Sequence, residues 1–180
     1  MIAGIENFAE TAHLFGWLLV RELDTPLLVR LHRKPVSDAF AAIGIQVPHE
    51  DLDHLHAEYY ACFLAPQDSV PLVQSLWEGG SYDGPATARL RKLGEGLGLK
   101  LDSGVCRGAP VDHLGSILQL WSRLAANWPE HAADLARHHL SWAQAPLAKV
   151  AGRSSFYGQL ALATGDLIDQ IQQLSPVDDA

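Results

Sequence analysis

The sequence has little cysteine, no long apolar run and fewer basic than acidic residues, and each shortage excludes a class of protein. Cys62 and Cys106 are the only cysteines among the 180 residues, which is too few for a disulfide scaffold, and their spacing does not match a zinc motif. No segment approaches the ~18 consecutive apolar residues that a membrane-spanning helix needs. The sequence therefore predicts a globular protein in a reducing compartment.

The charge balance argues against polyanionic partners. Thirteen Lys and Arg residues stand against 21 Asp and Glu residues, giving a formal net charge of −8 at pH 7. An acidic surface repels nucleic-acid phosphate and anionic lipid, and it attracts cations. We therefore expect no nucleic-acid partner and no membrane insertion, and we expect a basic partner instead.

The N-terminal segment does not read as a signal peptide. Its apolar stretch at residues 15–20 has no basic region before it, and Glu6 and Glu10 precede it. A secretory signal begins with positive charge. The expected location is the cytoplasm.

Helical spacing dominates what is present. Apolar side chains recur at steps of three and four between residues 5 and 23, and again without a miss between residues 114 and 125. No alternating strand pair, hairpin signal or fixed repeat is found. We predict an all-α bundle of about eight to ten helices. Its later helices are expected between Pro48 and Pro66, at 70–79, from about Pro85, at 129–142 and up to about residue 174, the last of them capped by Ser154 or Ser155.

The longest loop expected from the sequence divides the chain. Residues 100–110 carry two glycines, a serine and a proline. We predict an N-terminal helical lobe at 1–99, a hinge loop at 100–111 and a C-terminal helical lobe at 112–180, together forming one structural domain.

Asp112 and His113 open the most regular of the expected helices. Asp is a favoured N-cap, which stabilises a helix by about 1 kcal/mol, so capping is the preferred interpretation. A catalytic pair would need a nucleophile within reach. Ser116 is one turn further along the same helix, and the sequence does not place it in a triad. No catalytic residue is therefore expected.

Two other clusters suggest chemistry less strongly. His49, Asp53 and His56 share one face of a helix and would suit a metal ion, but a solvated acidic first turn is preferred. Residues 94–98 are rich in glycine, yet no strand precedes them, so they indicate a helix end more than a phosphate loop. Trp77 and Tyr82 flank the Gly79–Gly80 break, where aromatic side chains make good walls for a peptide groove.

An ordered set of segments resembles a known family. The order of five segments resembles that in the TorD/DmsD/NarJ family of redox-enzyme maturation chaperones. The segments are EYYACFLAP, PLVQSLWEGGSYDGP, APVDHLGSILQLW, HHLSWAQ and SSFYGQLALATGDLI. The resemblance implies an all-helical, non-catalytic protein that binds the twin-arginine signal peptide of a molybdoenzyme subunit. It implies support for cofactor insertion, prevention of premature export, and a monomer or domain-swapped dimer.

The resemblance also implies site residues. Asp112 and His113 match the family's Asp-His pair, which is associated with signal-peptide binding, and Trp77, Tyr82 and Pro85 match its other peptide-facing region. Glu58, Tyr59 and Phe63 match a family helix motif, in which Cys62 replaces the usual Leu. Asp112 would accept an arginine of the leader, and Leu118 and Trp121 would floor the groove.

No bound cofactor is expected beyond weak guanine-nucleotide binding, because the client enzyme carries the molybdopterin. The alternative function is a helical metal-binding or GTP-hydrolysing protein. It is suggested by the nine histidines and by the glycine-rich helix end.

Overall fold

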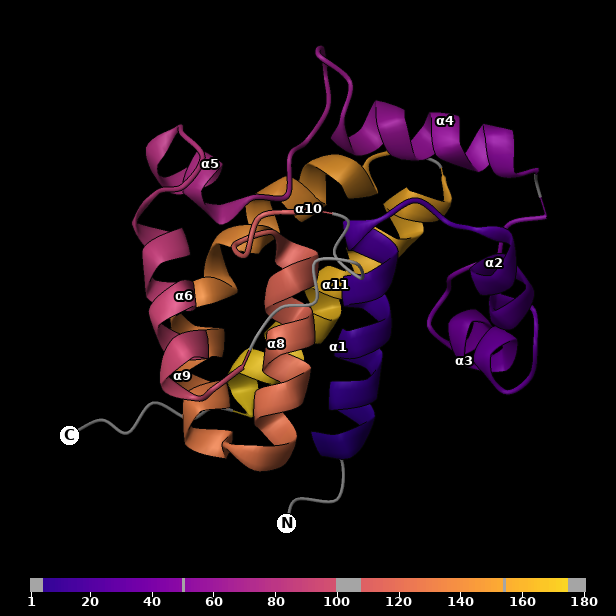
Figure 1. Ribbon diagram of the computed structural model, residues 1–180. Coiled ribbons are helices and arrows are strands. Elements are labelled where there is room, and N and C mark those ends of the chain that lie inside the picture. Colours follow the sequence, from indigo (N-terminus) through magenta and orange to yellow (C-terminus); the bar gives the residue numbers. More distant parts are fainter. Residues whose placement is uncertain (1–4, 50, 100–107, 154, 175–180) are drawn as a thin grey trace. The chain divides into compact units, whose positions relative to one another are not determined.

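The computed structural model describes residues 5–49, 51–99, 108–153 and 155–174 (Figure 1). Their regular structure is helical, which confirms the all-α prediction. The described residues hold no strand, and the isolated bridge between Val73 and His113 is the β pairing found among them. None of the helices in these ranges is both long and apolar enough to cross a membrane.

The helices group into two compact units that are interleaved in the sequence. The first contains residues 1–21, 72–143 and 166–180, and the second contains 22–71 and 144–165. This division differs from the predicted lobes at 1–99 and 112–180, because helices pack with neighbours that are distant in the chain. The predicted hinge at 100–111 falls largely on residues 100–107, outside the described residues.

In the first unit, two long helices cross at a pair of glycines. Helix α1 (Ile5–Val20) lies beside α8 (Leu114–Asn127), as Figure 1 shows. A Cβ added at Gly16 would lie 2.6 Å from the carbonyl oxygen of Gly115, and one added at Gly115 would collide with the carbonyl of Gly16. Only glycine permits backbones to approach this closely. The other elements of this unit among the described residues are α5 (Gln74–Gly79), α6 (Pro85–Gly96), α9 (Pro129–His139), a 3-10 turn at Ser141–Ala143 and the end of α11 (Phe156–Gln173).

The second unit is built around an aromatic cluster. It contains α2 (Thr25–Leu31), α3 (Val36–Ala42), α4 (Leu52–Phe63), α10 (Gln144–Ala151) and the first part of α11. The rings of Tyr59 and Phe63 lie 5.4 and 5.6 Å from the ring of Tyr157. Glu58 accepts a hydrogen bond from the backbone N–H of Tyr157 at 3.0 Å, so the family-motif residues of α4 anchor the start of α11. Burial raises the pKa of Tyr157, which stays neutral.

The boundaries of three helices test the sequence predictions. Ser155 accepts from the backbone N–H of Gly158 at 3.1 Å and so caps α11 as predicted. The helix expected from residue 70 begins only at Gln74, because residues 72 and 73 pair with the segment before α8 instead. The helix expected over 129–142 ends at His139, and a separate 3-10 turn follows it.

Candidate functional site

The segment before α8 pairs with the segment before α5. The backbone N–H of Leu114 donates to the carbonyl of Leu72 at 2.8 Å, and the N–H of Gln74 donates to the carbonyl of Asp112 at 3.0 Å. These bonds flank the bridge between Val73 and His113. Two motifs that are almost 40 residues apart in the sequence are thereby joined at the start of α5.

Asp112 caps α5, not the helix that follows it in the chain. Its Oδ2 accepts from the backbone N–H of Ser75 at 2.9 Å. Helix α5 needs this partner because its own N-cap residue, Val73, has no side-chain oxygen to cap it. A carboxylate also interacts favourably with the positive end of a helix. The prediction that Asp112 caps α8 is therefore wrong. The N-cap of α8 is His113, whose Nδ1 accepts from the N–H of Gly115 at 3.1 Å.

The side chain of Asp112 is shielded from solvent. Its exposed fraction is 0%, and its second oxygen, Oδ1, has no hydrogen-bond partner in the described part of the chain. A guanidinium group of a bound peptide therefore has no access to this carboxylate in the present conformation. Burial lowers the pKa of the adjacent His113 to about 4, against the opposing effect of the Asp112 charge.

Gln74 and His139 extend the buried polar contacts toward α9. The Nδ1–H of His139 donates to Gln74 Oε1 at 2.8 Å. The Gln74 amide nitrogen donates to Glu78 at 2.7 Å and to the carbonyl of His138 at 3.2 Å. Burial, and then the charge of Arg89, lower the pKa of His139 to about 4. This histidine is therefore neutral at pH 7.

Ser75 links α5 to the start of α6. Its hydroxyl accepts from the backbone N–H of Gly84 at 3.2 Å and lies 3.3 Å from the hydroxyl of Thr87. We call the buried polar residues around the start of α5 the α5 network: Gln74, Ser75, Thr87, Asp112 and His139. Each of them is at most 5% exposed. Three of the segments that carry the family resemblance thus meet at these residues.

The α5–α6 corner, residues 77–85, is accessible where the α5 network is not. Tyr82 is 62% exposed, Pro85 is exposed and Trp77 is half-buried. The turn is shaped by left-handed backbone at Gly80 (φ 74°) and Asp83 (φ 55°). The structure therefore places Trp77, Tyr82 and Pro85 on one connection, as the sequence suggested.

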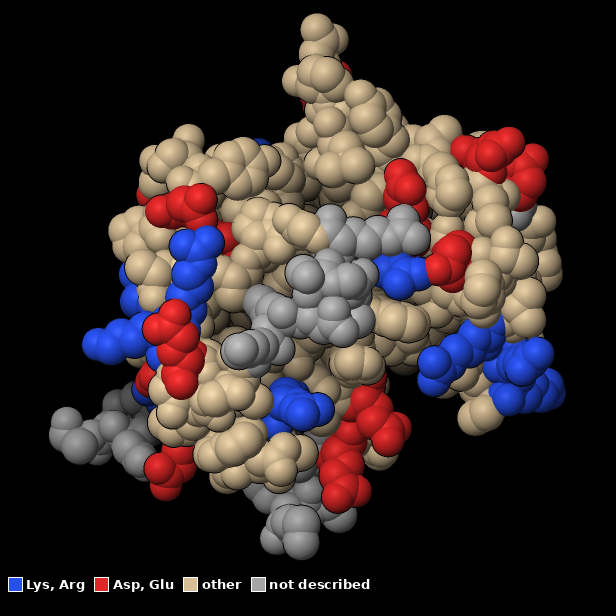
Figure 2. All heavy atoms as spheres, in the orientation of Figure 1, with Lys and Arg blue, Asp and Glu red and all other residues tan. Residues whose placement is uncertain are grey.

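The corner also carries two carboxylates that the sequence reasoning missed. Glu78 lies 3.5 Å from Arg89, and Asp83 lies 3.0 Å from Arg91. Figure 2 shows acidic and basic side chains alternating over this face of α5 and α6. The signal was present in the sequence, because each of these acids is next to Trp77 or Tyr82.

Leu118 and Trp121 do not line the base of an open groove. Their exposed fractions are 0% and 2%, so both belong to the core. Helix α8 instead presents other side chains to a groove of about 970 Å³ within the first unit. This groove is lined by His13, Trp17, Arg91, Glu95, Gln119 and Arg123, among others. The guanidinium of Arg21 stacks on Trp17, 4.9 Å from the ring centre.

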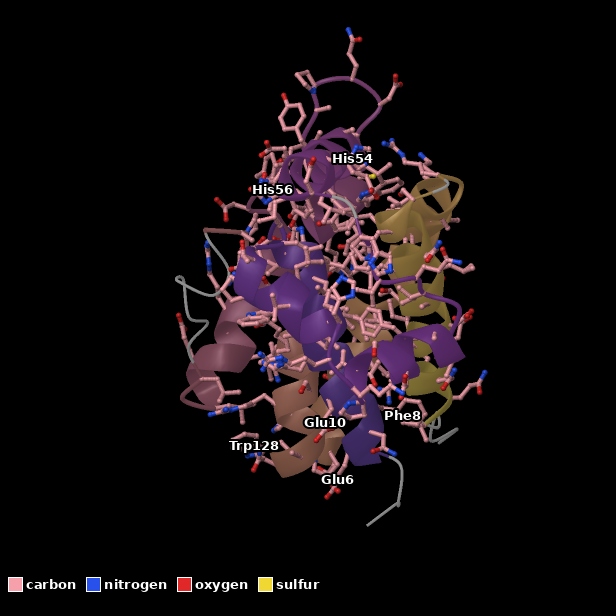
Figure 3. The ribbon with its side chains drawn as sticks, turned by 90° about the vertical axis from the view of Figure 1, so that its right-hand side faces the viewer. Glu6, Phe8, Glu10, His54, His56 and Trp128 are labelled. Carbon is pink, nitrogen blue, oxygen red and sulfur yellow. The ribbon has the colours of Figure 1, made fainter. Side chains whose placement is uncertain are left out.

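The residues behind the alternative functions are used in other ways. The described residues contain no group of three or more His, Cys, Asp and Glu side chains that would hold a metal ion. His56, labelled with His54 in Figure 3, uses its Nε2 to contact the carbonyl of Leu23 at 2.6 Å. The glycine-rich segment is the end of α6, with Gly98 in left-handed backbone (φ 65°), as predicted.

The fold of the chain is similar to that of a protein of known structure. A solved structure, that of a candidate redox enzyme maturation protein from Archaeoglobus fulgidus, has a TM-score of 0.65 and 22% sequence identity. The similarity covers 89% of this chain and 93% of the other and shows a shared fold. None of the curated proteins compared with the chain matches it.

The sequence itself identifies the family. Residues 31–151 match the model of the nitrate reductase delta subunit family. The chain belongs to this family, which confirms the resemblance to the NarJ/TorD-type redox-enzyme maturation chaperones. The family is one of redox-enzyme maturation chaperones.

Proposed function

We propose that this protein binds the twin-arginine leader of a molybdoenzyme subunit in the cytoplasm. In this role it holds the precursor while the cofactor is inserted and prevents premature export. The binding role requires no cofactor of its own, since the client carries the molybdopterin. The observation that carries the proposal is the α5–α6 corner, where two exposed carboxylates lie near exposed Tyr82 and half-buried Trp77.

The corner offers the chemistry that a twin-arginine leader needs. Such a leader presents two guanidinium groups followed by a moderately apolar segment. Glu78 and Asp83 are 42% and 70% exposed, so both can accept charge-assisted bonds from arginine. Exposed Tyr82 and half-buried Trp77 provide apolar contact beside them.

The arginine partners of these carboxylates are exchangeable, and Glu78 can keep the bond that its Oε1 accepts from Gln74 because Arg89 faces its Oε2. Arg89 and Arg91 are 51% and 60% exposed, and exposed ion pairs of this kind contribute about 0–1 kcal/mol each. The leader's arginines therefore displace them at little cost. In this proposal, Arg89 and Arg91 occupy the acceptor sites while no leader is bound.

In this proposal, Asp112 and His113 hold α5 in place and do not contact the leader. Asp112 holds the first turn of α5 through Ser75 and Gln74. The corner begins three residues after Gln74 in the same short helix. The proposed role of the Asp-His pair is therefore to fix the surface that meets the leader, without contact between Asp112 and the peptide.

Titration calorimetry with a synthetic twin-arginine leader tests the proposal. The wild type should bind, and Glu78→Gln combined with Asp83→Asn should weaken binding by about tenfold at low salt, because two exposed charge pairs are lost. Arg89→Gln combined with Arg91→Gln should tighten binding severalfold, since two competitors are removed. A leader with both arginines replaced by glutamine serves as the peptide control.

The peptide titrations and the substitutions test different parts of the proposal. Absence of heat with the leader of any molybdoenzyme encoded beside this gene would reject the leader-binding role. Binding that is unaffected by either pair of substitutions would keep the role and move the site away from the corner.

A further inference from the structure

A cluster of positive charge stands out on the second unit of this acidic protein. Arg30, Arg33 and Lys34 are the only Lys or Arg residues between positions 22 and 88. All three are exposed, and they line a shallow pocket of about 720 Å³ with Thr25, Pro26, Val29 and Val36. In Figure 2, Lys and Arg spheres gather where Figure 1 places α2 and α3. We call Arg30, Arg33 and Lys34, with Val29 between them, the basic patch.

Local structure fixes which way this patch faces. Helix α2 starts at a proper cap, since Asp24 accepts from the N–H of Leu27 at 2.9 Å. Leu27 and Leu31 are buried, so they orient the helix by their shared face. Val29 and Arg30 therefore point outward, and Val29 is 45% exposed.

The cations of the patch are only weakly neutralised. Lys34 lies 3.4 Å from Asp38, with both side chains at least 61% exposed. Neither Arg30 nor Arg33 has a salt-bridge partner within the described residues. Two guanidinium groups thus stand free beside an exposed valine, an arrangement that is complementary to carboxylates next to an apolar side chain.

The number and setting of the charges select among anionic partners. Polybasic membrane sites carry about four to eight Lys or Arg residues, more than this patch has. A nucleic acid would meet a protein with a net charge of −8, which opposes a long polyanion. A short acidic segment of another protein needs fewer cations than a membrane surface does and carries less negative charge than a nucleic acid. An apolar side chain of such a segment can also contact Val29.

We infer that the basic patch docks an acidic segment of a partner protein, with an apolar side chain of that segment seated against Val29. The inference goes beyond leader binding, because a leader that begins with two arginines is repelled by this surface. It gives the chaperone a second contact, of opposite charge preference, on the unit that does not carry the α5–α6 corner.

Fluorescence anisotropy on the full chain tests the inference. The probe is a short labelled peptide with acidic residues on either side of a leucine. Arg30→Glu combined with Arg33→Glu should weaken its binding by about tenfold or more at low salt, and high salt should abolish binding by the wild type. Val29→Ser should weaken binding severalfold, as should replacement of the leucine by serine in the peptide.

A matched control comes from α6. Arg33→Glu and Lys92→Glu change the net charge equally, and both residues are exposed. Only Arg33→Glu should weaken binding, and circular dichroism should show both variants folded. If Arg33→Glu fails to fold, Arg33→Gln replaces it, with Lys92→Gln as its control.

Three results would overturn the inference. They are equal losses in the Arg33 and Lys92 variants, equal binding of a neutral peptide with Asn and Gln in place of the acids, and preferential binding of inorganic phosphate or of phosphatidylserine vesicles. None of these outcomes depends on whether the protein binds a twin-arginine leader.

Discussion

The two ends of α5, which is only six residues long, differ sharply in solvent exposure and in hydrogen bonding. At its start, Gln74 and Ser75 are 0% and 2% exposed and are held by Asp112 and His139. At its end, Glu78, Gly79 and Gly80 are exposed, and the pairs with Arg89 and Arg91 lie on the surface. One end of the helix is fixed by buried hydrogen bonds, whereas the other is exposed, with the Oε1 of Glu78 bonded to Gln74 and its Oε2 facing exposed Arg89.

The contrast separates two roles for motif residues. A buried polar group must keep its partners, because leaving it unsatisfied costs about 1–3 kcal/mol. An exposed pair exchanges partners at a cost of about 0–1 kcal/mol. The Asp-His motif belongs to the first kind. The acids of the corner belong to the second kind and suit recognition.

The largest effect is expected where α8 begins. Gly115→Ala should lower the free energy of unfolding by about 3 kcal/mol, because its Cβ would meet the backbone of α1 and cannot be accommodated by a side-chain shift. Urea denaturation measures the loss. The matched control is Gly79→Ala at the exposed end of α5, where nothing lies within 4 Å of an added Cβ. It should alter stability by less than about 1 kcal/mol. Equal effects at the two glycines would mean that α1 and α8 do not cross here.

A smaller loss is expected at Asp112. Asp112→Ala leaves the buried N–H of Ser75 without its acceptor and should cost about 2 kcal/mol in urea denaturation. Asp112→Asn keeps a carbonyl oxygen for that N–H and should cost about 1 kcal/mol or less. If support is its role, Asp112→Asn also leaves leader affinity unchanged in calorimetry. A tenfold loss of affinity in a folded Asp112→Asn variant would show instead that the charge itself meets the leader.

The smallest effect is a dependence of stability on pH. The pKa of His139 is lowered from 6.5 to about 4 by burial. Between these values the unfolded chain binds a proton that the folded chain does not, so stability falls as the pH drops from 6.5 toward 4 and changes no further below that. His113 contributes in the same direction. His139→Gln should reduce the slope of unfolding free energy against pH by about 1 kcal/mol per pH unit.

The neighbouring histidine provides the control for this measurement. The side chain of His138 is 58% exposed, 3.5 Å from Asp134. His138→Gln should change the slope less than His139→Gln does, because burial is the first cause of the lowered pKa of His139 and the charge of His138 is a minor one. An equal change of slope in both variants would show that burial of His139 is not its cause.

Much of the fold was predictable because apolar periodicity is local. The stripe along residues 114–125 predicted α8, and Ser155 and Pro85 marked the starts of α11 and α6. The helix boundaries at Gln74 and His139 were missed, because pairing with a distant segment and the turn after α9 override local preference. The interleaved units were missed for the same reason.

The candidate site was only partly predictable. Trp77, Tyr82 and Pro85 follow from the glycine break that exposes them. An Asp at position 112 is typical of a helix N-cap, but the sequence does not say which helix it caps. Glu78 and Asp83 look like ordinary surface acids until the turn places them beside accessible aromatic side chains.

The sequence by itself determined the helices, the acidic balance and the family, since each is set by residue spacing, composition or order along the chain. Only the tertiary structure decided that Asp112 is enclosed while Glu78 and Asp83 are accessible. Solvent exposure depends on which distant segments pack over a residue, and in this protein the pairing of residues 72–74 with 112–114 made that choice.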